Sequence, residues 1–308
     1  MSAGENSDRI CIGIEVGKTA LSAARVDANG NVTDRETAEV SFSETSTSQL
    51  IYFISSLRSS LGDFDRVGVA VPGLVAPDKK KVAFSSNIPE HSGLDLGGEI
   101  EAAVGVPVYI ENDANAAAFG EFKLGAGQGA ANMFYATLGI GVGGALIING
   151  EIWRGAAGYA GEFGFVPINS EGTRLEDVAS SANIIRRTRS RFHQDSTSSL
   201  VELDENTLTI ADIVAAATAG DDFAQLMLER TGTYVGTGIA SVINILNIER
   251  IVVGGEIMQA GELIMNPIID RARELSFAPS FASASIVHGD LAGFAAATGV
   301  ALLACQNS

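Results

Sequence analysis

The sequence is poor in the residues that build structural metal sites. It contains two cysteines, Cys11 and Cys305, and three histidines, His91, His193 and His288, among its 308 residues. A structural zinc site needs four such ligands, most often in closely spaced pairs. The two cysteines cannot supply such a set and the histidines form no cluster along the chain, so we expect no zinc. The wide separation of the two cysteines also fits a protein of the reducing cytoplasm.

Basic residues and long apolar runs are scarce too. The chain has 20 Lys and Arg against 37 Asp and Glu, a net charge of −17. Phosphate backbones attract basic surfaces, so we expect no nucleic-acid partner, and an acidic surface also disfavours anionic membranes. The sequence contains no run of about 20 apolar residues, the length that spans a bilayer. Residues 1–8 are polar and small, unlike a signal peptide, which again favours a cytoplasmic protein without membrane contact.

The most informative segment that is present runs from Glu111 to Glu121. An apolar stretch at 106–110 predicts a buried strand, and the Ala-rich stretch from Ala114 predicts a helix. Asn112 and Asp113 therefore lie at the rim of a sheet, where ligands bind in open α/β folds. Asp113 is placed either to act as a catalytic base or simply to cap the helix, since Asp is a favoured N-cap residue.

Two glycine-rich turns recur in the two halves of the chain. Residues 10–19 and 133–144 each predict a strand that ends in a Gly turn, and each is followed by a second strand and an Asn-Gly turn. One such cluster alone is best explained as an ordinary hairpin. Two at matching positions indicate an internal duplication, with two similar lobes facing each other across a cleft. Amides in such turns can cradle phosphates, and Gly254-Gly255, after a third apolar strand, offers a place for adenine or ribose.

Taken in order, these segments resemble the ROK family of sugar kinases, and specifically its glucokinase-like members. The resemblance covers nearly the whole chain and includes further matches at 71–75, 87–89, 161–164 and 175–176. It implies an α/β protein with the two-lobed actin-like ATPase (ribonuclease H-like) fold and a cleft between the lobes. The smaller lobe would hold residues 1–115 plus 291–308, and the larger lobe residues 116–290.

The family's activity implies ATP-dependent phosphorylation of a hydroxyl of a hexose or amino-hexose, with Mg²⁺, in a homodimer. Such transfer relies on positioning and charge neutralisation, and Asp113 would be the general base. The resemblance assigns the sugar to Gly73, Asn87, Asn112, Asp113, Glu162 and Glu176. It assigns the nucleotide to Glu15, Gly17, Lys18, Thr19, Gly139, Gly141, Gly143, Gly254 and Gly255. The alternative for Glu162 and Glu176 is that both carboxylates merely face solvent.

The chain also departs from the family pattern. Glu15 stands where the first phosphate turn normally has Asp, and Lys18 stands where it has Gly. Ile140 replaces a hydroxyl residue of the second turn, and the loss of one donor to a transferring group costs about 3 kcal/mol. Phe165 and Arg174 replace a His and a Cys of the family's zinc module, so residues 166–176 must hold their shape by packing alone.

These departures leave two interpretations open. One is the hexose kinase, and the other is a non-catalytic sugar-binding or regulatory homologue with a degenerate phosphate site. Repressors of the same family carry a DNA-binding domain before the kinase-like part. Here the first phosphate strand begins near Arg9, and we expect no such domain. The residues do not distinguish ATP from polyphosphate as the donor, nor one hexose from another.

Overall fold

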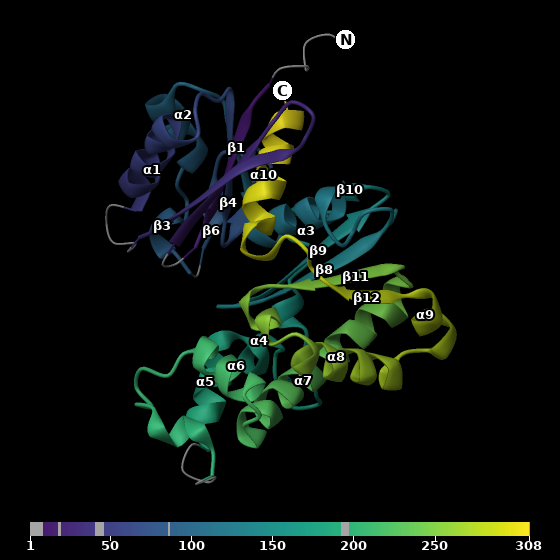
Figure 1. The fold of residues 1–308 in the computed structure, drawn as a ribbon. Helices are drawn as coiled ribbons and strands as arrows, with labels where there is room; N and C mark the ends of the chain where they lie inside the picture. Colours follow the sequence, from purple (N-terminus) through teal and green to yellow (C-terminus); the bar gives the residue numbers. More distant parts are fainter. Residues whose placement is uncertain (1–8, 18–19, 41–45, 86, 192–196, 308) are drawn as a thin grey trace. The chain divides into compact units, whose positions relative to one another are not determined.

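A computed structural model describes residues 9–17, 20–40, 46–85, 87–191 and 197–307 (Figure 1). The chain divides into two compact units. The first comprises Met1–Gln128, Glu151–Ala160 and Gly293–Ser308, and the second comprises Gly129–Gly150 and Gly161–Ala292. These units place residues 116–128 and 151–160 with the first unit, whereas the expected boundary between the lobes was residue 115.

The first unit is built on a five-stranded sheet in the order β3-β2-β1-β4-β7. Strand β1 pairs antiparallel with β2 and parallel with β4, and β4 pairs parallel with β7. The strands are β1 (Cys11–Val16), β2 (Ala20–Val26), β3 (Val32–Glu39), β4 (Arg66–Val71) and β7 (Val108–Asn112), with a two-stranded ribbon of β5 (Leu74–Val75) and β6 (Val82–Phe84). The helices are α1 (Ser46–Ser60), α2 (Leu96–Val104), α3 (Asp113–Leu124) and α10 (Ala295–Gln306).

Strand β1 shows how alternation in the sequence sets the two faces of this sheet. Ile12 and Ile14 belong to the apolar core that also contains side chains of α1 and α2. The intervening Gly13 faces α10, and a Cβ at that position would lie 1.9 Å from the carbonyl oxygen of Ala297. The strand therefore needs glycine where α10 crosses it, and Figure 1 shows α10 in yellow beside β1 and β4.

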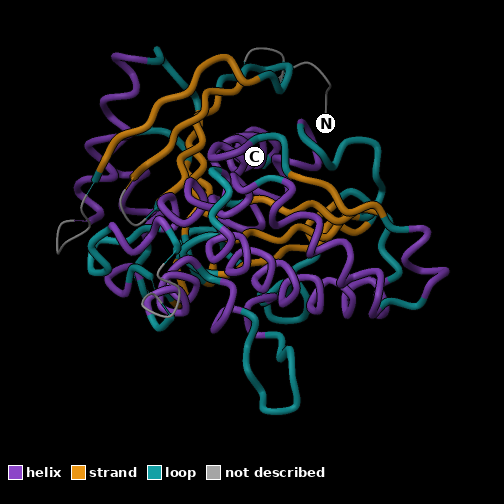
Figure 2. The backbone as a smooth tube through the Cα atoms, turned by 60° about the horizontal axis from the view of Figure 1, so that its bottom comes forward, coloured by secondary structure: helices purple, strands orange, loops and turns teal. Residues whose placement is uncertain are grey.

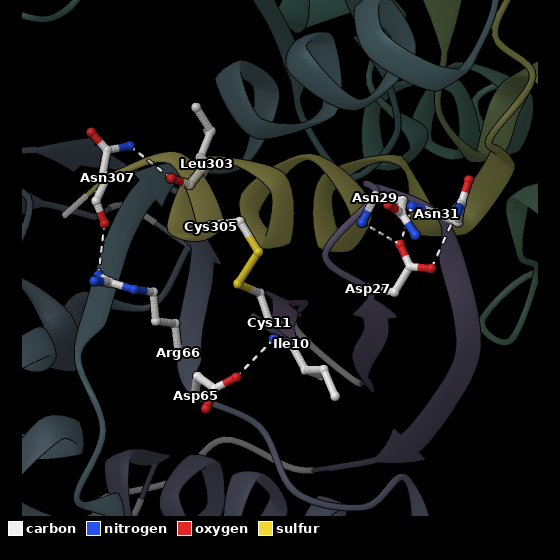
Figure 3. The surroundings of a disulfide bond; sticks show 10 residues. All are labelled: Ile10, Cys11, Asp27, Asn29, Asn31, Asp65, Arg66, Leu303, Cys305 and Asn307. Atoms are coloured by element: carbon white, nitrogen blue, oxygen red, sulfur yellow. Dashed lines mark hydrogen bonds between the residues drawn. A yellow bond between two sulfur atoms is a disulfide. The ribbon is translucent and has the colours of Figure 1, made fainter. Parts of the chain in front are cut away.

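The two cysteines are joined in a disulfide between β1 and α10, although they are 294 positions apart in the sequence (Figure 3). Cys11 lies on the same face of β1 as Gly13, and its Cα lies 5.9 Å from that of Cys305. At the same end of the unit, Arg66 of β4 bonds the residue that follows α10, since its Nη1 donates to the carbonyl oxygen of Asn307 at 2.7 Å. The wide separation of the two cysteines along the sequence gave no sign of this pairing, which forms because α10 returns to the sheet that β1 begins.

The second unit repeats the topology of the first. Its sheet has the order β10-β9-β8-β11-β12, with β8 antiparallel to β9 and parallel to β11, which is parallel to β12. This confirms the internal duplication that the two Gly turns predict. The strands of this unit are β8 (Met133–Leu138), β9 (Val142–Ile148), β11 (Arg250–Gly254) and β12 (Ser285–His288). The edge strand β10 (Glu151–Ile152) falls within residues 151–160, which are grouped with the first unit. Figure 2 shows the strands of the sheets in orange and the helices in purple.

The core of the second unit lies between its sheet and its helices, and it includes Phe134 of β8, Val253 of β11 and Ile239 of α7. The helices are α4 (Glu176–Ala179), α5 (Ser181–Arg189), α6 (Ile210–Thr218), α7 (Asp222–Leu246), α8 (Glu262–Leu275) and α9 (Ala278–Ser283). Gly232 and Gly236 let α7 approach α8 closely, because a Cβ on either would lie within 2.7 Å of a carbonyl oxygen of α8. Within the described ranges, no helix combines the length and apolarity needed to cross a membrane.

Candidate functional site

The corner between β7 and α3 holds Asn112 and Asp113 in a fixed arrangement. Asn112 is the N-cap of α3, and its Oδ1 accepts a hydrogen bond from the Asn115 amide at 3.0 Å. Its Nδ2 donates to Asp113 Oδ1 and to the carbonyl oxygen of Gly73, both at 3.0 Å. Asp113 Oδ1 also accepts from the Ala114 amide at 2.9 Å. Asp113 is therefore not the helix cap, and two N–H donors orient one of its carboxylate oxygens.

The carboxyl group of Glu15, at the end of β1, interacts electrostatically with Asp113 at this corner. Burial, together with the Asp113 carboxylate, raises the pKa of Glu15 to about 7. Two interacting carboxyl groups, of which Glu15 has a raised pKa, are suited to bind a hard cation that prefers oxygen ligands. In the turn that follows, the Gly17 amide donates to the carbonyl oxygen of Ala20 at 3.0 Å. Lys18 and Thr19, also expected at this turn, lie outside the described residues.

Gly73 and the loop that carries Asn87 are packed together. Gly73 has φ +146°, and a Cβ there would lie 2.4 Å from the carbonyl oxygen of Phe84, so both conformation and space require glycine. Ser85 Oγ donates to the carbonyl oxygen of Pro72 at 2.5 Å and accepts from the Ile88 amide at 3.1 Å. This brings the loop against the residue that precedes Gly73. Asn87 is exposed on that loop.

In the second unit, the turn between β8 and β9 is fixed from two sides. The carbonyl oxygen of Gly139 accepts from the Ser181 amide at 2.8 Å, at the start of α5. Glu176 Oε2 accepts from the Val142 amide at 3.0 Å and lies against Gly141, where a Cβ would be 2.8 Å from it. Gly143 is paired with Thr137 across the hairpin. The expected phosphate turn is thus attached directly to a residue expected to bind the sugar.

Glu162 and Glu176 interact within this unit. Burial, with the Glu176 carboxylate as the second cause, raises the pKa of Glu162. Glu162 is nonetheless exposed and Glu176 is half-buried, so the solvent-facing alternative stays open for Glu162.

Between these two carboxylates in the sequence, Phe165 and Arg174 contact each other. The Arg174 guanidinium carbon lies 4.6 Å from the centre of the Phe165 ring. The Leu175 amide donates to the carbonyl oxygen of Val166 at 3.0 Å, and residues 167 and 174 form a β-bridge. The residues that replace two expected zinc ligands thus form a cation–π contact.

Gly254 and Gly255 end β11 beside the same turn. Gly255 has φ +99°, and a Cβ there would lie 2.3 Å from the carbonyl oxygen of Leu138. The next residue, Glu256, accepts a hydrogen bond from Ser181 Oγ at 2.6 Å. The contact between Ser181 and Glu256 was not predicted from the sequence, because the two residues are 75 positions apart.

The sequence also failed to predict what surrounds Glu111. Lys79 and Arg154 both form ion pairs with this buried carboxylate in the first unit. The position of Glu111 next to an apolar strand could have indicated such partners, because a buried acidic residue requires a partner for its charge. Over the part of the chain that the structure describes, no group of three or more His, Cys, Asp or Glu side chains is arranged to hold a metal ion.

The chain is similar to proteins named glucokinase and xylose repressor. A glucokinase of Halalkalibacterium halodurans is 33% identical over 282 residues, which cover 85% of this chain and 84% of that protein. The xylose repressor of Bacillus spizizenii is 28% identical over 83% of this chain and 67% of its own length. The crystal structure of a ROK family glucokinase from Streptomyces griseus, in complex with glucose and AMPPNP, superimposes with a TM-score of 0.88 at 28% identity. That match covers 97% of this chain and 100% of the other.

The model of the ROK family matches residues 11–307. The chain belongs to the ROK family and has the two-lobed actin-like ATPase fold of its kinases.

Proposed function

We propose that this protein transfers the terminal phosphoryl group of ATP to a hydroxyl of a hexose or amino-hexose. The observation that carries the proposal is the Asn112–Asp113 corner. There, two N–H donors hold Asp113 Oδ1 at the end of a parallel strand. A carboxylate oriented in this way is suited to accept a proton from a sugar hydroxyl. The similarity to proteins named glucokinase supports the same reaction.

In the proposed reaction, the hydroxyl oxygen of the sugar attacks the terminal phosphorus of ATP. A bond forms between that oxygen and phosphorus, and the bond from phosphorus to the bridging oxygen of ADP breaks. Asp113 takes the hydroxyl proton. Both hydrogens of Asn112 Nδ2 are already donated, so Asn112 would orient the acceptor through the remaining lone pair of its Oδ1. Glu162 and Glu176 would accept hydrogen bonds from other hydroxyls of the sugar.

The nucleotide side is assigned to the glycine turns and to Glu15. Gly17, Lys18, Thr19, Gly139, Gly141 and Gly143 would surround the phosphates, and Gly254 and Gly255 would border the nucleoside. Mg²⁺, when bound with ATP, neutralises charge on the phosphates. Glu15 would hold it directly or through water, which fits the raised pKa of Glu15 because a nearby cation would stabilise its ionised form.

A second candidate is a protein that binds the sugar without phosphorylating it. Ile140 favours it, because this side chain is 49% exposed in the β8–β9 turn and offers no donor to a phosphate. The similarity to a xylose repressor shows that the fold also occurs in proteins named for regulation.

The test is a coupled ADP-release assay with Mg²⁺ and ATP, or polyphosphate in a parallel product assay, against a panel of hexoses and amino-hexoses. Asp113→Asn serves as the paired variant, since it keeps the size and the hydrogen bonds of the corner but is a far weaker base. Turnover of one sugar that falls at least a thousandfold in the variant is expected, on the order of the loss of a general base. Thermal stabilisation by a sugar without any turnover would favour the binder instead.

A further inference from the structure

The first unit contains a buried carboxylate that no step of the proposed reaction uses. Glu111 lies on β7 immediately before Asn112, and only 1% of its side chain is exposed. Lys79 Nζ donates to both of its oxygens, at 3.0 and 3.1 Å. Arg154 Nη2 donates to Oε2 at 2.6 Å, and the Tyr109 hydroxyl donates to the same oxygen at 3.1 Å.

The other side of Glu111 points to the corner that carries Asp113. Its Oε1 accepts from the Asn112 amide at 3.0 Å and from Asn115 Nδ2 at 3.3 Å. These two residues flank Asp113 and bond to each other through the cap of α3. Oε1 thus fixes the residues on both sides of the proposed base, while Arg154 holds Oε2 and Lys79 holds both oxygens.

The ionised state of Glu111 is secured by those cations. Burial alone would raise the pKa of Glu111, but the charges and hydrogen bonds of Lys79 and Arg154 outweigh it and leave the pKa below its usual value. Replacing Glu111 and its two cations together by apolar side chains of similar volume would give the strand about the same stability, because buried ion pairs seldom gain more than their desolvation costs. Stability of β7 is therefore a poor explanation for the charge.

Lys79 adds an independent indication. Its backbone has φ +56°, a left-handed conformation that a Lys residue seldom adopts. The conformation is held by the Ile110 amide, which donates to the carbonyl oxygen of Lys79 at 3.0 Å. Unfavourable conformations of this kind persist where the surroundings enforce them, and they are concentrated at functional sites. Here the conformation places Nζ against Glu111.

We propose that Glu111, paired with Lys79 and Arg154, is a positioning residue that holds the Asn112–Asp113 corner in the geometry for proton transfer. The inference rests on the proposed function. None of the three side chains touches the sugar in this scheme. They act through the amide of Asn112 and the side chain of Asn115.

Lys79→Met tests the proposal, and the neighbouring lysine provides a matched control. Lys80 anchors the same loop to β7, since its Nζ donates to the carbonyl oxygen of Val108 at 2.9 Å and pairs with Glu101. Lys80 makes no contact with Glu111 among the interactions of the described residues.

We expect Lys79→Met and Arg154→Met to lower kcat at least tenfold with little change in the KM for ATP. Lys80→Met should leave both constants within about twofold, and Lys79→Arg should restore most of the kcat because it returns a cation to Glu111.

Hydrogen exchange gives a readout that does not depend on turnover. The Asn112 amide, which donates to Glu111, should exchange faster in Lys79→Met than in Lys80→Met. Equal losses of kcat and equal exchange in the two variants would overturn the proposal, because they would show a general effect of anchoring the loop. An unchanged kcat in Lys79→Met would overturn it as well. If the wild-type protein turns over no hexose, the proposed function itself fails, and that result is distinct from either of these.

Discussion

At the scale of single residues, Glu15 gives the clearest consequence for pH. Burial and Asp113 raise its pKa to about 7 from 4.5. Between these two values the folded protein retains a proton that the unfolded chain releases, so this group lowers stability progressively as pH rises through that window. In Mg²⁺-free and nucleotide-free buffer, Glu15→Gln should gain on the order of 2 kcal/mol relative to the wild type between pH 5 and pH 8.

Thermal unfolding at half-unit pH steps measures this effect. Glu39→Gln, at an exposed position on β3 of the same unit, is the control and should leave the shape of the wild-type curve unchanged. If the curves of Glu15→Gln and the wild type run parallel across this range, the carboxyl group is not perturbed by burial and by Asp113.

The residues of the corner were predictable to different degrees. The change from an apolar strand to an Ala-rich helix was enough to place Asn112 and Asp113 at the rim of the sheet, and β7 and α3 meet there. Which of the two caps the helix depends on side-chain rotamers, which a sequence pattern does not fix. Lys79 and Arg154 lie 32 and 43 positions from Glu111, so pairing them required the fold.

At the scale of elements, the segment between Glu162 and Glu176 is expected to keep its shape without a metal. The Phe165–Arg174 contact and the backbone bonds of residues 166–175 connect the two ends of the segment. A double-mutant cycle with Phe165→Leu and Arg174→Gln should give a coupling of about 0.5–1 kcal/mol, as for a cation–π pair near the surface. EDTA should leave the unfolding temperature unchanged. Additive effects of the two substitutions, or a lower unfolding temperature in EDTA, would contradict this account.

Elements with a strong local pattern were predicted well. The strands expected within residues 10–19 and 133–144 occur as β1 (Cys11–Val16) and β8 (Met133–Leu138), each before its glycine turn. The contact between Phe165 and Arg174 was not predicted, because the sequence showed only that each replaces a metal ligand. Their stacking depends on the hairpin-like path of the intervening chain.

At the scale of the whole molecule, the repeated sheet topology follows from the paired Gly turns, whereas the extent of each unit does not. Residues 151–160 belong with the first unit, where Arg154 meets Glu111. That grouping brings together positions far apart in the sequence and has no local signature. The return of residues 291–308 to the first lobe was expected, but the pairing of Cys11 with Cys305 was not, since it depends on which face of β1 meets α10.

The disulfide predicts how the redox state affects stability. A cross-link between positions 294 apart constrains nearly the entire unfolded chain, and a loop of that length contributes about 6 kcal/mol in the chain-entropy model. Reduction with dithiothreitol should therefore lower the unfolding temperature of the wild type by several degrees, towards that of Cys305→Ala.

The Cys305→Ala variant itself should not respond to dithiothreitol, which controls for effects of the reductant on other groups. A thiol titration of the unfolded wild type should find no free cysteine before reduction and two after it. Two free thiols at the outset, or an unfolding temperature indifferent to reduction, would show that β1 and α10 are held by packing alone.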